Sequence, residues 1–329
     1  MIRNRTATVL LAALLAALSC MFLTSAPAWS RVGAPAEPAE PTAPTVRSGH
    51  AARANHAAPA APAGPAAPAG PAAPAASASL KEGADLTASG AQVFQGRAFD
   101  TCTAPPLSTM AAWRSSGYGA VGVYVGGRAR ACHQQQLTRE WVRAVSDMGW
   151  RIIPVYVGSQ SPCVTRESKR PFPIDIADPV SHGAEEARDA VMQARALGIV
   201  ERSPVYLDME AYAPRGPRCS EPVVSFTRGW SQELRRYGYF PGFYSSAASG
   251  ITDIAEARRI GIRDLPEVVW YARWNARPAL AAEPVLAAGH WTPNRRLHQY
   301  EGNVKETHGG RSMLIDRNVI DAPVAVVER

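Results

Sequence analysis

Short apolar runs alternate with amphipathic stretches along the chain from about residue 80 to its end. Each run is four to eight residues long and rich in β-branched and aromatic residues, which is typical of buried strands. We expect eight strands, at residues 97–100, 120–126, 151–158, 203–210, 240–246, 267–274, 296–300 and 313–316.

Helical spacing fills several of the intervals between these runs. Apolar residues recur every three or four positions within 141–148, 187–197 and 226–237, and a glycine then ends each series, at Gly149, Gly198 and Gly238. The connections after the sixth strand and before the eighth are only weakly helical. Eight strands with intervening helices in about 250 residues predict an α/β fold with a single (β/α)8 barrel of the TIM type.

The first residues have the pattern of an export signal. Arg3 and Arg5 precede an apolar run at 9–23, and the small-residue sequence Ala26-Pro27-Ala28 follows it. The run is short for a membrane span, so we expect residues 1–30 to be a removed signal peptide. The mature chain would then be secreted and have no transmembrane segment.

Two further features precede the expected barrel. Cys20 lies inside the apolar run, but Ala17-Leu18-Ser19 before it is a poor lipoprotein signal, so we favour plain secretion over lipid attachment. Residues 31–79 are dominated by Ala and Pro, with too few large apolar groups to form a core and too many prolines for a helix. We expect a disordered spacer at 31–79 and the barrel at 80–329.

Charge and cysteine content narrow the classes of partner. The part from Leu80 onward carries 30 basic and 26 acidic residues, without a Lys/Arg stripe that alternates with aromatic residues, so we expect no nucleic-acid partner.

Four cysteines in an exported chain predict two disulfides, and the sequence leaves all three pairings open. They lack C-x-x-C spacing and a nearby His cluster, so we expect neither a metal nor a cofactor. The four are Cys102, Cys132, Cys163 and Cys219.

The fourth expected strand ends in two carboxyl groups, Asp208 and Glu210. Because side chains alternate along a strand, both share a face with Tyr206, opposite Leu207 and Met209. Two carboxyls held in one cleft do not ionise independently, and one is driven towards the neutral acid that glycosidic bond cleavage requires. Taken alone, an Asp-x-Glu sequence is more often a solvated strand end.

Other expected strands end in similar chemistry. Asp100 ends the first and Asp316 the eighth, and these two strands become neighbours when a barrel closes. Aromatic rings beside carboxylates are suited to a sugar, whose apolar faces stack on rings while its hydroxyls need acceptors. The rings expected to bind the sugar, together with Tyr206, are Tyr244, Trp270, Trp274 and Tyr300.

Six sequence motifs in register resemble the lysozyme-type barrels of glycoside hydrolase family 25. They resemble still more closely the secreted glycoside-hydrolase-like family known as domain of unknown function 1906. The resemblance spans about residues 96–320. The motifs are Phe99-Asp100, Tyr206-Leu207-Asp208-Met209-Glu210, Pro241-Gly242-Phe243-Tyr244-Ser245, Trp270-Tyr271-Ala272-Arg273-Trp274, His298-Gln299-Tyr300 and Ile315-Asp316-Arg317-Asn318.

This resemblance implies a role for each acid. Glu210 would donate a proton to the leaving glycosidic oxygen, and Asp208 would stabilise the oxocarbenium-like centre or orient a substrate N-acetyl group. Asp100 and Asp316 would line the subsite of the sugar that is attacked. Glu210 is the longer side chain, and we expect it to lie deeper among aromatic residues and to have the raised pKa. Gln299 and Asn318 join the expected substrate-binding residues.

Three functions follow as alternatives. The first is a secreted, monomeric muramidase-like hydrolase acting on cell-wall polysaccharide, with peptidoglycan the expected substrate. The second is a catalytically inactive barrel that binds wall glycan, and the third is an envelope scaffold whose acids are neutralised in ion pairs. Arg273 and Arg317 are the cations expected to distinguish them, because either one on Glu210 would favour the second or third alternative.

Overall fold

The structure is a computed structural model that describes residues 79–213 and 216–329. The expected signal peptide, Cys20 and the spacer up to residue 78 lie outside the described residues. Among the helices of the described ranges, none has both the length and the apolar character needed to span a bilayer.

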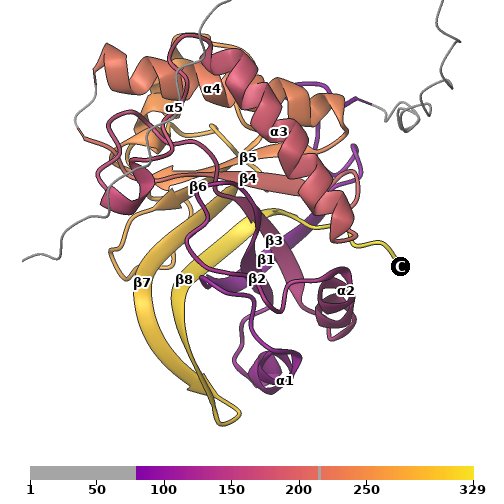
Figure 1. The fold of residues 1–329 in the computed structure, drawn as a ribbon. Coiled ribbons are helices and arrows are strands. Elements are labelled where there is room, and N and C mark those ends of the chain that lie inside the picture. The colour runs from indigo at the N-terminus through magenta and orange to yellow at the C-terminus, as the bar shows by residue number, and fades with distance from the viewer. Residues whose placement is uncertain (1–78, 214–215) are drawn as a thin grey trace, which may run out of the picture. The chain divides into compact units, whose positions relative to one another are not determined.

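Eight strands close into one barrel in sequence order, which confirms the predicted architecture (Figure 1). Each expected apolar run lies within or overlaps one strand, and β2 and β5 have the expected bounds. The strands are β1 (Gln92–Asp100), β2 (Ala120–Gly126), β3 (Arg151–Tyr156), β4 (Pro204–Met209), β5 (Phe240–Ser246), β6 (Val268–Ala272), β7 (Arg296–His308) and β8 (Arg311–Val324).

Helices fill the first five connections between strands. Local sequence explains their ends: the Thr138 side chain accepts a hydrogen bond from the Trp141 amide at the start of α2, and Asp178 does the same for α3. The three predicted terminator glycines all have positive φ. The helices are α1 (Leu107–Ala112), α2 (Arg139–Asp147), α3 (Pro179–Ala196), α4 (Pro217–Arg236) and α5 (Gly250–Arg259), with short 3-10 turns η1 (Trp113–Ser115) and η2 (Glu167–Lys169).

The last two connections depart from a regular (β/α)8 barrel. β6 continues into the irregular segment 273–295, and β7 turns directly into β8 through Gly309 and Gly310, both with positive φ. β8 therefore runs antiparallel to both of its neighbours, β7 and β1. The two strands project from the barrel as a long hairpin (Figure 1). The predicted runs at 296–300 and 313–316 cover only part of each strand, because polar and charged residues are interspersed along the rest of both.

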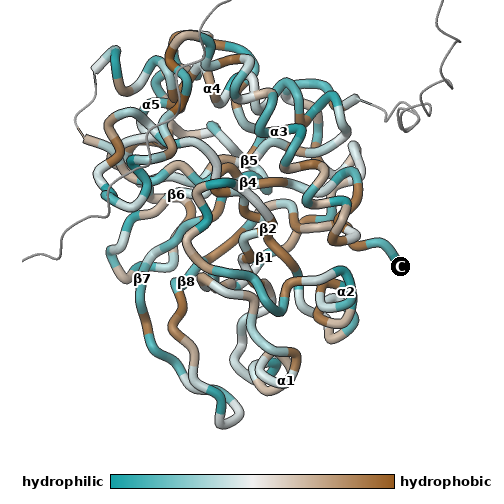
Figure 2. The backbone as a smooth tube through the Cα atoms, viewed as in Figure 1, coloured by the Kyte–Doolittle hydropathy of each residue, from teal (hydrophilic) through white to brown (hydrophobic). Residues whose placement is uncertain are grey.

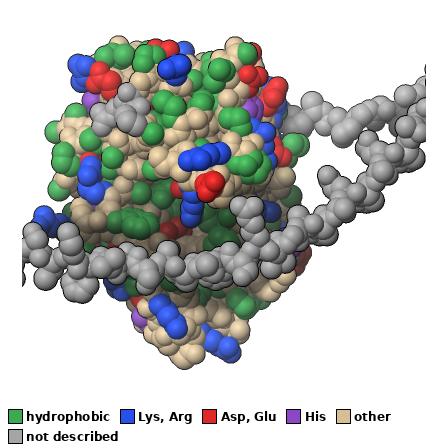
Figure 3. Space-filling view, turned by 60° about the vertical axis from the view of Figure 1, so that its left-hand side comes forward, with side chains coloured by type: hydrophobic (Ala, Val, Ile, Leu, Met, Phe, Trp, Pro, Cys, Tyr) green, Lys and Arg blue, Asp and Glu red, His purple; other side chains and the backbone are tan. Residues whose placement is uncertain are grey.

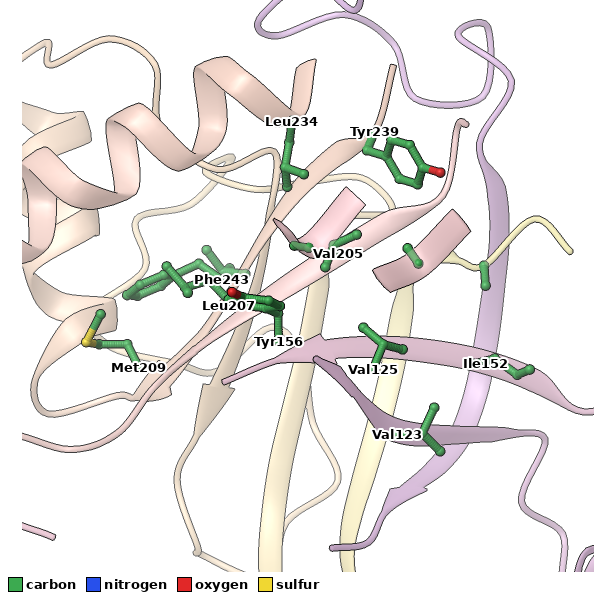
Figure 4. Close-up of a cluster of buried hydrophobic side chains, with 14 of the residues drawn as sticks. Val123, Val125, Ile152, Tyr156, Val205, Leu207, Met209, Leu234, Tyr239 and Phe243 are labelled. Atoms are coloured by element: carbon green, nitrogen blue, oxygen red, sulfur yellow. The ribbon is translucent and has the colours of Figure 1, made fainter. Parts of the chain in front are cut away.

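The hydrophobic core has two layers, separated by the wall of the barrel. Tyr206 belongs to the cluster inside the barrel, whereas Leu207 and Met209 belong to the cluster between the strands and the helices. Figure 4 shows this outer cluster, with Leu207 close to Phe243 of the neighbouring strand. The central strands carry the most hydrophobic stretches of the backbone (Figure 2). The predicted alternation along β4 is thus confirmed, and it aims the next inward residue, Asp208, at the barrel mouth.

Two disulfides connect loops at the carboxyl ends of the strands. Cys102 pairs with Cys132, joining the loop after β1 to the loop after β2. Cys163 pairs with Cys219, joining the loop after β3 to the first turn of α4. The structure thus selects one of the three pairings that the sequence left open.

Close contact between α3 and α4 depends on two glycines. A Cβ atom on Gly183 would lie 2.0 Å from the Phe226 carbonyl oxygen, and one on Gly229 would lie 1.9 Å from that of Val180. Both obstacles are backbone atoms, so a rotamer change cannot relieve the clash.

We expect Gly183→Ala to lower the free energy of unfolding by about 1–3 kcal/mol, because the added methyl forces the two helices apart. Urea denaturation followed by circular dichroism measures the change. Gly216→Ala is the matched control, since a Cβ there meets nothing within 4 Å. Its cost should stay below about 1 kcal/mol, from the weaker helix cap alone. An equal loss in both variants would contradict the packing argument.

Candidate active site

The four acids singled out in the sequence line one cavity of about 460 Å³. Asp100, Asp208, Glu210 and Asp316 reach this main cavity from β1, from the end of β4 and from β8. A second cavity of about 390 Å³ adjoins it and is lined partly by aromatic side chains. Glu210 lines both cavities, so the two meet at this residue. One face of the molecule is hollowed, with acidic and basic side chains gathered beside the hollow (Figure 3).

Asp316 reaches the mouth by a different route from the one predicted. It lies within β8 rather than at its end, because β8 continues to Val324 and runs antiparallel to its neighbours. The register of β1 and β8 sets Asp100 directly opposite Asp316. The expected proximity is therefore correct, but the parallel eighth strand behind that expectation is not.

A short hydrogen-bond network fixes this first pair of carboxyls. Asn318 Nδ2 donates to Asp100 Oδ1 at 2.6 Å, and Gln299 Nε2 donates to Asp100 Oδ1 at 3.1 Å and to Asp316 Oδ2 at 3.3 Å. The Asn303 amide donates to Asp316 Oδ1 at 2.6 Å. Burial, and then the neighbouring charge of Asp316, raise the pKa of Asp100 to about 8. Burial also raises the pKa of Asp316.

Gln299 links this carboxyl pair to the second cavity. Its Oε1 accepts hydrogen bonds from the Tyr244 hydroxyl at 2.9 Å and from Trp274 Nε1 at 3.0 Å. Oxygen towards the aromatic donors and nitrogen towards the carboxyls is the orientation that satisfies every partner. The side chain therefore couples the position of the two rings to that of the acids.

The depths of the second pair of carboxyls, Asp208 and Glu210, are the reverse of those predicted. Asp208 is 3% exposed, and its Oδ1 is buried without a hydrogen-bond partner among the described residues. Burial first, and then the charge of Glu210, raise the pKa of Asp208 well above its usual range. The Glu210 side chain is 19% exposed. Because β4 ends at Met209, Asp208 still points into the barrel, whereas Glu210 lies beyond the strand and is the shallower of the two.

Glu210 is paired with a cation, but not with either of the predicted ones. Arg273 forms a two-pronged ion pair with Glu283, and Arg317 contacts Glu301 and Glu306. Arg166 Nη1 instead lies 2.5 Å from Glu210 Oε1, and Lys169 Nζ lies 4.0 Å from the same oxygen.

Sequence reasoning missed these two cations because they belong to the loop between β3 and α3. That loop has no periodicity that would place its side chains. It is held over the mouth by the Cys163–Cys219 disulfide and by a bridge between Val164 and Tyr212. Cys163, one of the four cysteines expected to form disulfides, was the one signal in the sequence that this loop is tied to a distant segment.

Gln160 and Tyr124 are two more residues of the site that the sequence did not reveal. Fully buried Gln160 donates to the Asp208 carbonyl at 2.8 Å and accepts from the Glu210 amide at 2.8 Å, so it braces the end of β4 on both sides. Tyr124 on β2 lines the main cavity. Burial, and then the charge of Asp208, raise the pKa of its hydroxyl.

The predicted substrate-binding residues fall into three groups. Tyr244, Trp274 and Gln299 line the second cavity. Tyr206, Trp270 and Asn318 are fully or almost fully buried under the mouth, where they support the acids: Trp270 Nε1 donates to Asn318, and the Tyr206 hydroxyl donates to the Pro323 carbonyl.

Tyr300 forms the third group, since it lines neither cavity. It follows inward-facing Gln299 and so points to the opposite face of β7. The prediction of direct ligand contact is therefore wrong for four residues. Tyr206, Trp270 and Asn318 lie too deep, and Tyr300 faces the other side of its strand.

No group of three or more His, Cys, Asp or Glu side chains within the described ranges is arranged to hold a metal ion.

Comparison with known proteins identifies the family. The family model described as "Rv2525c-like, glycoside hydrolase-like domain" matches residues 111–320. Among curated proteins no relative of the chain is found.

Several solved structures are similar to the chain. An uncharacterized B. stearothermophilus protein is 18% identical, with 68% of this chain and 95% of that one covered and a TM-score of 0.43. A family 25 glycosyl hydrolase from Bacillus anthracis is 14% identical, covering 69% and 89%, with a TM-score of 0.42. The bacterial lysozyme from Streptomyces coelicolor is also 14% identical, covering 70% and 94%, with a TM-score of 0.42. Since the family model matches well over half of the chain, the protein belongs to the Rv2525c-like, glycoside hydrolase-like domain family.

Proposed function

We propose that this barrel is a secreted hydrolase that cleaves glycosidic bonds of a cell-wall polysaccharide, peptidoglycan in the first instance, by carboxylate acid–base chemistry. The observation that carries the proposal is the position of Glu210 between two adjoining cavities. A proton donor to a glycosidic oxygen has to lie between the sugars on either side of the bond. Membership of a glycoside hydrolase-like family supports the same conclusion.

In this mechanism each carboxyl has its own task. Once its contact with Arg166 is broken, Glu210 takes up a proton from solvent and gives it to the leaving oxygen, while water supplies the hydroxyl group that the attacked sugar gains. Asp208, whose pKa is raised by burial, offers its unpartnered Oδ1 to the N-acetyl group or to a ring hydroxyl of the attacked sugar. Asp100 and Asp316, oriented by Gln299, bind hydroxyls of the same sugar.

The second cavity would take the sugar on the other side of the scissile bond. Tyr244 and Trp274 both line it, and the Trp274 side chain is more than half exposed although its Nε1 is hydrogen-bonded. A ring held in place yet open on one face can stack on the apolar face of a sugar. This arrangement gives the leaving-group side of the substrate a defined position.

One observation favours a second function, glycan binding without turnover. A general acid must carry a proton, yet Glu210 contacts the permanently charged Arg166 at 2.5 Å. The Arg166 side chain is 62% exposed, and ion pairs with such exposed partners contribute little stability, so substrate can displace it. Activity measurements distinguish the two functions.

We expect the wild type to release reducing ends from purified cell wall, and Glu210→Gln to release them at least ~100-fold more slowly, because the amide cannot donate the required proton. Binding of the wall should survive the substitution. Glu256→Gln, an exposed carboxyl on α5 that lines neither cavity, is the control and should keep wild-type activity. Equal release by wild type and Glu210→Gln would remove Glu210 from its role, and binding without release by the wild type would establish the second function.

We also expect stability to fall as the pH rises from 5 to 8. The folded-state pKa of Asp100, about 8, lies above its usual 3.8, so the native state holds a proton that the unfolded chain has lost. Its stabilisation is complete below pH ~4 and is lost as the pH rises through about 8. Asp100→Asn mimics the protonated side chain and should flatten this slope, though not abolish it, since Asp208 contributes in the same direction.

Chemical denaturation at each pH measures this slope. Asp147→Asn on α2, outside both cavities, should keep the slope of the wild type. An unchanged slope in Asp100→Asn would show that Asp100 is already ionised in the folded protein at pH 5.

A further inference from the structure

Arg166 has unusual freedom for a residue that contacts the proposed proton donor. Its side chain is 62% exposed, it lines the main cavity, and the Glu210 carboxyl is its one hydrogen-bond acceptor among the described residues. A guanidinium group has five N–H donors, so most of them remain available to a ligand in the cavity.

The backbone that carries Arg166 is fixed, so the side chain can move independently of its loop. The Thr165 amide donates to the Ala211 carbonyl at 3.0 Å, and the Ala213 amide donates to the Cys163 carbonyl at 3.0 Å. The nearby Cys163–Cys219 disulfide ties the same loop to α4. Motion of Arg166 away from Glu210 therefore requires only a change of rotamer.

Two more cations line the same cavity. Exposed Arg130 donates to the Tyr124 carbonyl at 3.2 Å and has no ion-pair partner in the described part of the chain. Lys169 is 3% exposed, and its Nζ donates to the Ala129 carbonyl at 2.7 Å. Both lie on loops at the carboxyl ends of strands, as Arg166 does.

The main cavity is therefore less negatively charged than its four acids suggest. Burial raises the pKa values of Asp208 and Asp316, and that of Asp100 reaches about 8, so burial drives these three carboxyls towards their neutral forms. Three cations line the same cavity, and two of them, Arg166 and Lys169, lie beside Glu210. Such a cavity attracts an anionic group rather than repelling it.

From these contacts we propose that Arg166 determines specificity by exchanging partners: it leaves Glu210 for an anionic substituent of the incoming glycan, which Arg130 also binds. The ligand class is a glycan with a carboxylate or phosphate group beside the scissile linkage. The exchange frees Glu210 to carry the proton it needs, so the anion that selects the substrate also prepares the acid. This inference rests on the proposed function, in that it takes the main cavity to be the glycan site.

The test compares glycans that differ only in charge. One soluble wall-glycan fragment with free carboxylates is compared with its methyl ester, and a phosphate-substituted fragment distinguishes the two sources of the anion. Binding is measured by isothermal titration calorimetry with wild type, Arg166→Gln, Arg166→Lys and Arg130→Gln. Arg143→Gln, an exposed arginine on α2 outside the cavity, is the matched control.

We expect the wild type and Arg143→Gln to bind an anionic fragment roughly tenfold to hundredfold more tightly than the ester, as is typical of a charge-assisted hydrogen bond. Arg166→Gln should lose most of this preference, Arg130→Gln part of it, and Arg166→Lys should keep part of it. Arg166→Gln should change turnover in opposite directions on the two substrates. It should cleave the ester faster than the wild type, in which no anion displaces Arg166 from Glu210, and it should cleave the acid more slowly. A purely structural role for Arg166 would lower both rates.

Equal binding of acid and ester by the wild type, no binding of either, or an undiminished preference in Arg166→Gln would overturn the proposal. Its failure is separable from that of the proposed function. Hydrolysis without a charge preference overturns only the partner exchange. A charge preference that depends on Arg166, without any release of reducing ends, overturns only the hydrolase.

Discussion

Closure of the barrel between its first and last strands is the constraint on which the candidate site depends. The antiparallel register of β1 and β8 sets Asp100 opposite Asp316 and brings Asn318 within 2.6 Å of Asp100, although 218 residues separate these two in the chain. Closure also removes the open sheet edges and excludes water from the interior below the mouth. Asp100 and Asp208 thus lie above the buried side chains of Tyr206 and Trp270, and this burial raises the pKa values of both carboxyls.

Depth divides the acids of the mouth into two kinds. Asp208 and Asp100 lie in the barrel opening, are almost completely buried and have raised pKa values. Glu210 lies one step outside, where cations and solvent reach it. A neutral acid beside a charged, accessible one is the arrangement expected of glycoside chemistry. Here, however, the buried partner is the residue proposed to orient the substrate, and the accessible one is the proposed donor.

Two disulfides restrain the loops that surround the mouth of the barrel. Both disulfides lie at this end of the barrel, and each connects loops that follow different strands. The Cys102–Cys132 bridge itself lines the main cavity, and the other bridge holds the loop of Arg166 and Lys169. Cross-links of this kind limit loop motion, so the flexibility that remains at the site belongs to side chains. For Arg166, this is the freedom that the partner exchange requires.

The sequence by itself determined the number and order of the strands, three of the five helices and the set of four acids. These follow from local periodicity and from the rule that strand ends meet at the mouth of a barrel. Only the tertiary structure decided the direction of β8 and the depths of Asp208 and Glu210. It also decided which arginine meets Glu210, because Arg166 lies in a loop whose position depends on a disulfide and on contacts with residues far along the chain. Local patterns record which face a residue takes, whereas depth, pairing and charge balance arise from contacts between distant segments.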